Sequence, residues 1–290
     1  MYLCFATGAA QIDFIRRLIA EDPAVGRSAL SRKVCEAWEW RQPNGQLCDM
    51  ICRGLLLQLE REGLVKLPPR KSTPHNPLAG NRKKPPFIEV DRSPIRCKLK
   101  GLGALEILSV RRTPWEKLVN RLIEHYDYLG YCHPVGEQIK YLVSSRGRPI
   151  ACFTFSSAPR HLGARDRFIG WSAEQRKANI RLIAYQSRFL ILPWVEVRYL
   201  ASHLLSRISK RVSSDWEALY RHPIYFLETF TNPTTHKGSC YRAAGWLALG
   251  LTTGRGKDAQ MKKPNRPIKV VWGYPLSADF RRALCGGLPA

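Results

Sequence analysis

The amino-acid sequence predicts an α+β protein in two parts, a small helical module followed by a larger domain with a mixed α/β sheet. Residues 11–68 contain three segments with apolar residues at helical spacing. Residues 95–290 instead alternate short β-rich runs with helical segments, the order of a mixed sheet with helices on both faces. Residues 69–94 between them are rich in Pro, Lys and Arg and poor in apolar residues, which indicates a linker.

The helical module has the element order of a winged-helix or helix-turn-helix domain. A first helix is predicted over 12–21, a second is capped by Ser28 or Ser31, and a third is capped by Asp49 and stops at Gly63. Residues 64–69 then predict a short strand. Such domains place one helix in the DNA major groove. A helical packing or dimerisation module has the same pattern, and the many basic residues of this part favour DNA.

The second domain alternates strand and helix signals along its length. The four residues 145–148 are typical of a turn and predict a hairpin between two of its strands. The predicted order is a strand at 105–110, a helix at 114–126, strands at 138–144 and 149–156, a helix at 172–185, a strand at 188–192, a helix at 198–212, a strand at 224–230, a helix at 239–247 and a strand at 269–274.

The charge of the chain predicts a polyanionic partner. Lys and Arg total 47 against 23 Asp and Glu, a net charge of +24 with a pI near 10.1, and the commonest polyanion is nucleic acid. We therefore expect DNA as a partner, and no membrane, because the longest apolar run is far shorter than the ~20 residues of a spanning helix. The predicted nucleic-acid-binding residues are Arg32, Lys33, Arg41, Arg53, Arg82, Lys83, Lys84, Arg165, Arg167, Arg242, Arg255, Lys257, Lys262 and Lys263.

Nine cysteines scattered among apolar neighbours indicate reduced thiols and a cytoplasmic protein. No basic region precedes the short apolar start, so a signal peptide is not predicted.

Five reactive or charged side chains lie inside or beside apolar runs, and these are the candidate catalytic residues: Asp166, His203, Glu228, Cys240 and Tyr241. A buried charge without a partner costs several kcal/mol, so such groups must pair, bind a ligand or react. One hypothesis makes His203, Glu228 and Cys240 or Tyr241 a base, an orienting group and a nucleophile or acid, with the Cys240 thiol activated at a helix start. Another has Asp166 and Glu228 bind a divalent metal. Ion pairing and core packing are the structural alternatives.

Three local features of the second domain resemble the acyltransferase fold of the GNAT superfamily. A hairpin precedes a strand that ends in Pro193, the next strand carries Glu228, and residues 241–246 are similar to the segment in which such enzymes place a tyrosine general acid. The resemblance implies a coenzyme A site. The glycine-rich pyrophosphate loop is missing, however, because residues 194–201 contain no glycine, and this argues against coenzyme A.

A broader resemblance is to the family of the Druantia anti-phage system protein DruA, whose members also occur linked to transposases. The segments HYDYLGY, RDRFIGWS, RFLILPWV, LETF and GSCYRAAGW resemble its motifs in order, and the matching segments together cover most of residues 125–276. The resemblance implies a bacterial or archaeal protein with a DNA-directed role in defence or mobile elements. It also implies other defence or transposition proteins as partners, and is compatible with an oligomer.

Two functions of different class follow. In the first, the helical module finds a DNA site and the second domain processes the DNA by strand cleavage, strand transfer or base modification. In the second, the second domain is a catalytically inactive acyltransferase-like domain that serves as a DNA-binding or assembly platform. The missing glycine loop favours the platform, and the dense set of polar residues favours the enzyme.

Overall fold

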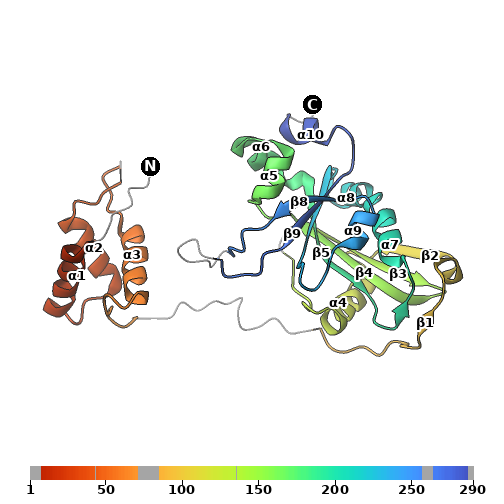
Figure 1. Ribbon diagram of the computed structural model, residues 1–290, viewed down its shortest axis with the longest axis horizontal. Helices are drawn as coiled ribbons and strands as arrows, with labels where there is room; N and C mark the ends of the chain where they lie inside the picture. Colours follow the sequence, from red (N-terminus) through yellow and green to blue (C-terminus); the bar gives the residue numbers. More distant parts are fainter. Residues whose placement is uncertain (1–7, 43, 71–84, 135, 257–263, 287–290) are drawn as a thin grey trace. The chain divides into compact units, whose positions relative to one another are not determined.

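The computed structural model describes residues 8–42, 44–70, 85–134, 136–256 and 264–286. The chain forms two compact units, residues 1–82 and residues 83–290 (Figure 1). Six of the predicted basic residues, Arg82, Lys83, Lys84, Lys257, Lys262 and Lys263, lie outside the described residues.

The first unit is built from three helices, as the sequence predicts: α1 (Ala9–Glu21), α2 (Arg27–Ala37) and α3 (Asp49–Arg61). Their apolar faces share one core, in which Ile15, Leu30, Val34 and Cys52 have no exposed surface. Removing these side chains from water is the main force that holds so short a helical unit together, because isolated helices of this length are marginal.

Two local expectations for the first unit are wrong. Gly26, not a serine, is the N-cap of α2, and the Ser31 hydroxyl donates to the Ser28 carbonyl instead. Residues 64–69 form no strand, because Pro68 and Pro69 lack the N–H groups that a ladder needs. Val65 and Leu67 instead pack as extended chain on the helical core. The described residues of this unit thus contain no wing, and the winged-helix assignment stays a prediction.

The second unit is a mixed seven-stranded sheet with the order β2-β3-β4-β5-β7-β9-β8 (Figure 1). The β5–β7 pair is parallel, and all other neighbouring pairs in this sheet are antiparallel. The strands are β2 (Leu105–Ser109), β3 (Gln138–Ser145), β4 (Arg148–Ser157), β5 (Ile183–Ile191), β7 (Phe226–Thr231), β8 (Leu247–Leu251) and β9 (Val270–Pro275).

Helices cover both faces of this sheet. Lys140 and Tyr141 are consecutive on β3 and so point to opposite faces. The Lys140 ammonium donates to side chains of α4 (Trp115–Tyr126), whereas the Tyr141 hydroxyl donates to Asp215 of α8 (Val212–Tyr220). One face therefore carries α4, and the other carries α8. Helix α7 (Leu200–Ser209) contacts α8, and its Leu204 and Leu205 are buried in the core.

The predicted helix at 172–185 is wrong in its second half. Helix α6 (Ala173–Asn179) ends early, a 3₁₀ turn (Ile180–Leu182) follows, and β5 begins at Ile183. The position of β5 between β4 and β7 pairs its backbone on both sides and buries Ile183 and Ala184, which outweighs local helical preference.

The sequence patterns do not predict the bounds or the existence of several further elements. The segment 198–212 divides into α7 and the start of α8, and the helix expected at 239–247 is the short α9 (Ser239–Ala243) followed by β8. The other unpredicted elements are β1 (Ile95–Arg96), the 3₁₀ helix Leu99–Leu102, α5 (Gly163–Ile169), β6 (Val195–Glu196) and α10 (Phe280–Cys285).

Strands β5 and β7 separate soon after they begin. They pair only from Ile183–Tyr185 to Phe226–Glu228, although β5 continues to Ile191 and β7 to Thr231. A bulge places Ser187 and Arg188 together opposite Thr154 of β4, and bulges bend the strand that carries them. The middle of the sheet therefore opens between the two strands.

Candidate active site

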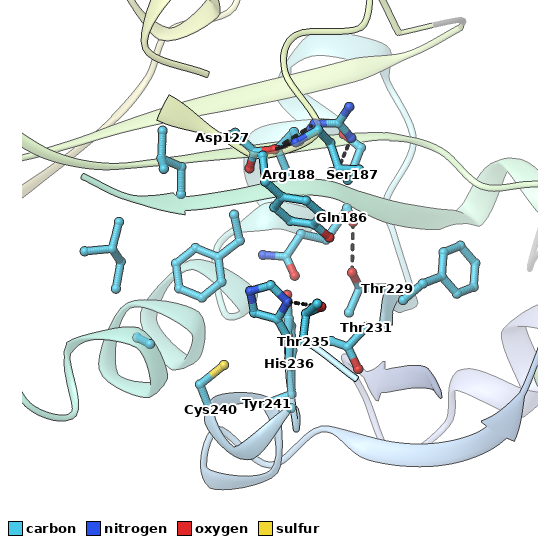
Figure 2. A pocket seen from close by; sticks show the side chains of 18 of the residues that line it. Asp127, Gln186, Ser187, Arg188, Thr229, Thr231, Thr235, His236, Cys240 and Tyr241 are labelled. Atoms are coloured by element: carbon cyan, nitrogen blue, oxygen red, sulfur yellow. Dashed lines mark hydrogen bonds and ion pairs between the residues drawn. The ribbon is translucent and has the colours of Figure 1, made fainter. Parts of the chain in front are cut away.

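The opening between β5 and β7 is a cavity of about 740 Å³, well within the size range of small-molecule sites. Its walls come mainly from the end of α4 with the segment after it, β5, β7, and α9 with the segment before it (Figure 2). Ala201 of α7 and Lys269, just before β9, complete them. The residues that line the cavity include Asp127, Tyr128, Gln186, Arg188, Thr229, His236, Lys237, Cys240, Tyr241 and Lys269.

In one wall, the Arg188 guanidinium of β5 binds the segment that follows α4. Its Nε atom donates to the Gly130 carbonyl at 2.9 Å and lies 3.5 Å from Asp127 Oδ1. Burial raises the pKa of Asp127, and both the backbone N–H of Leu129 and Arg188 oppose that rise. Asp127 is the single acidic residue among the described residues that line the cleft. With Lys237 and Lys269 also in the walls, the cleft carries an excess of positive charge.

The opposite wall contains the two candidate residues that the structure does place here, Cys240 and Tyr241. Tyr241 is only 7% exposed, stacks on Trp272 at 5.9 Å and meets Trp246 edge-on. Burial raises the pKa of both side chains. The expectation that a helix start lowers the pKa of Cys240 is therefore wrong, since α9 is a single short turn and desolvation of the thiolate dominates. Both groups stay protonated near neutral pH.

Gln186 lies between the two walls. Its backbone carbonyl accepts from the Thr229 hydroxyl at 3.0 Å across the gap. Its side chain is only 2% exposed, yet neither Oε1 nor Nε2 has a hydrogen-bond partner in the described chain. Figure 2 shows this side chain between Asp127 and Arg188 on one side and His236 and Cys240 on the other. An unpaired buried amide is costly, about 1–3 kcal/mol.

An aromatic pair joins the two walls. The rings of Tyr128, from the segment after α4, and His236, from the segment before α9, stack at 5.4 Å with an angle of 26°. The Thr235 hydroxyl lies 2.8 Å from Nδ1 of His236. Tyr128 itself is 69% exposed, so this stack lies on the solvent side of the cleft.

Asp166 and Glu228 do not line the cleft; they bind Arg165 in a buried cluster. The Arg165 guanidinium is fully buried, 3.2 Å from both Glu228 carboxylate oxygens and 2.9 Å from Asp166. Burial raises the pKa of Glu228 to about 7, and Arg165 opposes the rise. Asp166 also accepts from the Trp171 indole N–H and from Arg176. The structure thus separates these two carboxylates from Cys240 and Tyr241, and pairs both of them with the Arg165 guanidinium.

His203 lies on α7 and is not among the residues that line the cleft. Burial, and then the charge of Arg207, lower its pKa. No group of three or more His, Cys, Asp or Glu side chains that could hold a metal occurs in the part of the chain that the structure describes. For the metal hypothesis this leaves Asp166 and Glu228, both of which are already paired with Arg165.

Most of the described basic residues predicted to bind nucleic acid are on the surface. Arg165 is the exception, and its assignment to the nucleic-acid surface is wrong because its guanidinium is enclosed by protein. Arg167, Arg242 and Arg255 are exposed. The segment of Arg255 is tied to residues 265–269: the Gly256 N–H, for example, donates to Asn265.

Arg32 and Arg53 of the first unit line a second cavity of about 540 Å³ between α2 and α3. Arg27 and Arg70 also line it, and Arg27 is neutralised by Glu60 at 3.0 Å. Lys33 pairs with Asp22, and Arg41 donates to the Gly45 carbonyl.

The segment between β5 and α7 does not fit the phosphates of coenzyme A. It contains β6, which pairs in parallel with β1, and the Val195 N–H donates to the Leu192 carbonyl. Tyr199, in a left-handed conformation with φ of 67°, precedes α7 where a glycine-rich turn would be needed. This segment therefore does not form a phosphate site for coenzyme A.

Sequence reasoning missed most of the cleft. Gln186, His236, Lys237 and Lys269 give no local signal, because each is an ordinary polar residue in a strand or a loop, whereas Arg188 lies in RFLILPWV, a segment that carries the family resemblance. Asp127 and Tyr128 did have one, since they lie in HYDYLGY, a segment that carries the family resemblance.

The fold and the cleft define a class of protein with a mixed sheet that opens between two parallel central strands. The chain belongs to the family described as Druantia protein DruA, which matches residues 60–284. No curated protein matches it. No helix among the described residues is long and apolar enough to cross a membrane.

Several solved acetyltransferases are similar to part of this chain at low identity. An N-acetyltransferase from Staphylococcus aureus is 11% identical, with 60% of this chain and all of that chain covered at a TM-score of 0.39. A GNAT-family acetyltransferase from Streptococcus pneumoniae is 14% identical, with the same coverage and a TM-score of 0.36. An aminoglycoside acetyltransferase in complex with coenzyme A and kanamycin is 15% identical over 61% of this chain and 97% of its own, with a TM-score of 0.38.

Proposed function

We propose that this chain is a DNA-binding protein of Druantia antiviral defence and that its second unit acts on the DNA in the cleft between β5 and β7. The observation that carries the proposal is the chemistry of that cleft. Arg188, Lys237 and Lys269 face a single carboxylate, Asp127, which is itself close to Arg188. Cations combined with aromatic rings suit a nucleotide, since the cations attract phosphate and the rings stack on bases.

General acid–base catalysis on a bound nucleobase is the reaction that the cleft supports best. Covalent strand transfer requires a phenolate or thiolate nucleophile, and burial raises the pKa of both Tyr241 and Cys240. A protonated phenol donates a hydrogen bond, and it gives up its proton to a group that becomes strongly basic during the reaction. We therefore assign Tyr241 the role of general acid and favour base modification over strand cleavage.

The second candidate is a DNA-binding or assembly platform without catalysis. The observation in its favour is the segment between β5 and α7, where β6 pairs with β1 instead of leaving its backbone free to bind a cofactor's phosphates. In this case the cleft binds DNA, and replacing the Tyr241 hydroxyl changes nothing but stability.

DNA binding by the full chain tests the proposal. We expect affinity for a short DNA, measured by fluorescence anisotropy, to fall steeply between about 50 and 200 mM salt as counterions are released. The double variant Lys237→Gln/Lys269→Gln should reduce the salt slope by about 2, because each lysine that neutralises a phosphate adds about one to that slope. The matched control, Lys117→Gln/Lys177→Gln, removes two exposed lysines that do not line the cleft and should leave the slope nearly unchanged.

Two results would contradict the proposal. Affinity that does not change with salt would refute DNA binding by charge. Equal slopes for the cleft variant and its control would show that the DNA does not follow the cleft.

A further inference from the structure

We propose that the cleft between β5 and β7 binds one unstacked base of a DNA strand, and that the side-chain amide of Gln186 reads the edge of that base. This inference rests on the proposed DNA-directed function and names the group that the cleft receives. It starts from the amide itself, which is 2% exposed and has no partner for either polar atom among the described residues.

The amide chemistry selects the ligand. A glutamine side chain presents one acceptor and two donor hydrogens in a plane, and a base edge with a neighbouring donor and acceptor matches it. The best-matched partner in DNA is adenine, which pairs with Gln through N6 and N7. Pairing both atoms would remove the cost of leaving the buried amide unsatisfied, so the same interaction that selects the base also stabilises the complex.

The other groups of the cleft suit the rest of a nucleotide. The stacked rings of Tyr128 and His236 lie on the solvent side, where a base leaving a DNA stack would enter, and aromatic side chains replace base stacking. Lys237, which is exposed beside His236, and Lys269 supply positive charge for the adjoining phosphates. The cavity of about 740 Å³ is of the size that small ligands occupy.

The topology explains how a buried amide becomes available to a ligand. Had β5 and β7 stayed paired past Tyr185 and Glu228, their backbones would have closed the sheet here. Because they separate, only the Thr229 hydroxyl bridges to the Gln186 carbonyl, and the side chain is left between two walls.

Single-stranded DNA of defined composition tests the inference. We would measure affinities of the full chain for oligonucleotides of about twelve nucleotides: all-adenine, all-thymine, and a strand of abasic sites that keeps the phosphates. The wild-type chain should prefer adenine over thymine by at least about tenfold, as expected for a paired amide and base, and should bind both more tightly than the abasic strand because the bases also stack. Gln186→Met has similar length and no hydrogen-bonding group, so it should abolish the preference for adenine over thymine and leave affinity for the abasic strand unchanged.

Gln138→Met is the matched control. Gln138 is also a buried glutamine, 3% exposed with an unpaired Oε1, but it does not line the cleft. Both variants should raise the melting temperature, since each removes an unsatisfied buried polar group, but Gln138→Met should keep the full adenine preference. A structural role for Gln186 would change stability alone.

The outcomes separate this inference from the proposed function. If no strand binds, DNA binding itself fails. If the strands bind but the abasic one binds as well as the others, or Gln186→Met keeps the adenine preference, the base site is refuted and the DNA-binding proposal survives. If coenzyme A competes with the oligonucleotides and Gln186→Met prevents its binding, the cleft is a free-cofactor site and the inference is overturned.

Discussion

The buried cluster of Arg165 and Glu228 yields a prediction with a defined pH dependence. Arg165→Met keeps much of the side-chain length and removes the cation that faces a fully buried carboxylate. Breaking a buried pair by removing one partner costs about 3–5 kcal/mol. We expect a loss of that size in the free energy of unfolding at pH 8.5, measured by urea unfolding with tryptophan fluorescence.

The loss should depend on pH in a particular direction. In the folded wild-type chain, burial raises the pKa of Glu228 from 4.5 to about 7. Because the folded chain holds this proton more tightly than the unfolded chain, the stability that protonated Glu228 gives the fold is complete below about pH 4.5. That stability decreases by about 3 kcal/mol as the pH rises to about 7. Without Arg165 the folded pKa rises further, so the variant continues to lose stability above pH 7, where the wild type has levelled off. The loss at pH 8.5 should exceed the loss at pH 6 by about 2 kcal/mol.

Two further variants make this reasoning refutable. Adding Glu228→Gln to Arg165→Met removes the unpaired carboxylate, and should abolish the extra loss above pH 7 and restore part of the stability. Arg96→Met, the same substitution in the exposed pair with Glu196, should scarcely change stability, because solvent screens that pair. A loss at Arg165 that is small, or equal at pH 6 and pH 8.5, would show that the cluster is not a buried ion pair and would return Glu228 to the candidate catalytic residues.

Two other changes probe the cleft wall and the first unit. Gly238→Ala should lower the free energy of unfolding by about 2–5 kcal/mol, because φ is +70° and the new Cβ would overlap the Trp272 indole. Gly147→Ala has a similar φ of +74° but open space around the new Cβ, so it should cost only about 1–2 kcal/mol, and equal losses in thermal unfolding would exclude the overlap as the cause. Arg32→Gln/Arg53→Gln removes two of the arginines around the cavity between α2 and α3 and should weaken DNA binding and lower its salt slope by about 2, measured by anisotropy; an unchanged slope would remove this surface from the DNA interface.

Much of the fold could be predicted from local sequence, and the errors have one physical origin. Strands such as Gln138–Ser145 and Phe226–Thr231 are found because β-rich runs are bounded by turn residues. For the strand that begins at Ile183 the sequence predicts helix up to residue 185, because the local pattern continues that of α6 and only pairing with β4 and β7 makes it a strand. Short elements such as α9 carry too few residues for any period to show.

The sequence by itself determined the basic character of the chain, its α+β class, its family resemblance and a set of polar residues in apolar surroundings. Only the tertiary structure decided which of those residues belong together. Asp166 and Glu228 form ion pairs with Arg165 because a buried carboxylate requires a cation, whereas Cys240 and Tyr241 line the cleft. That cleft, and the unpaired amide of Gln186 in it, exist because two parallel strands diverge, and strand divergence depends on contacts between residues far apart in the sequence.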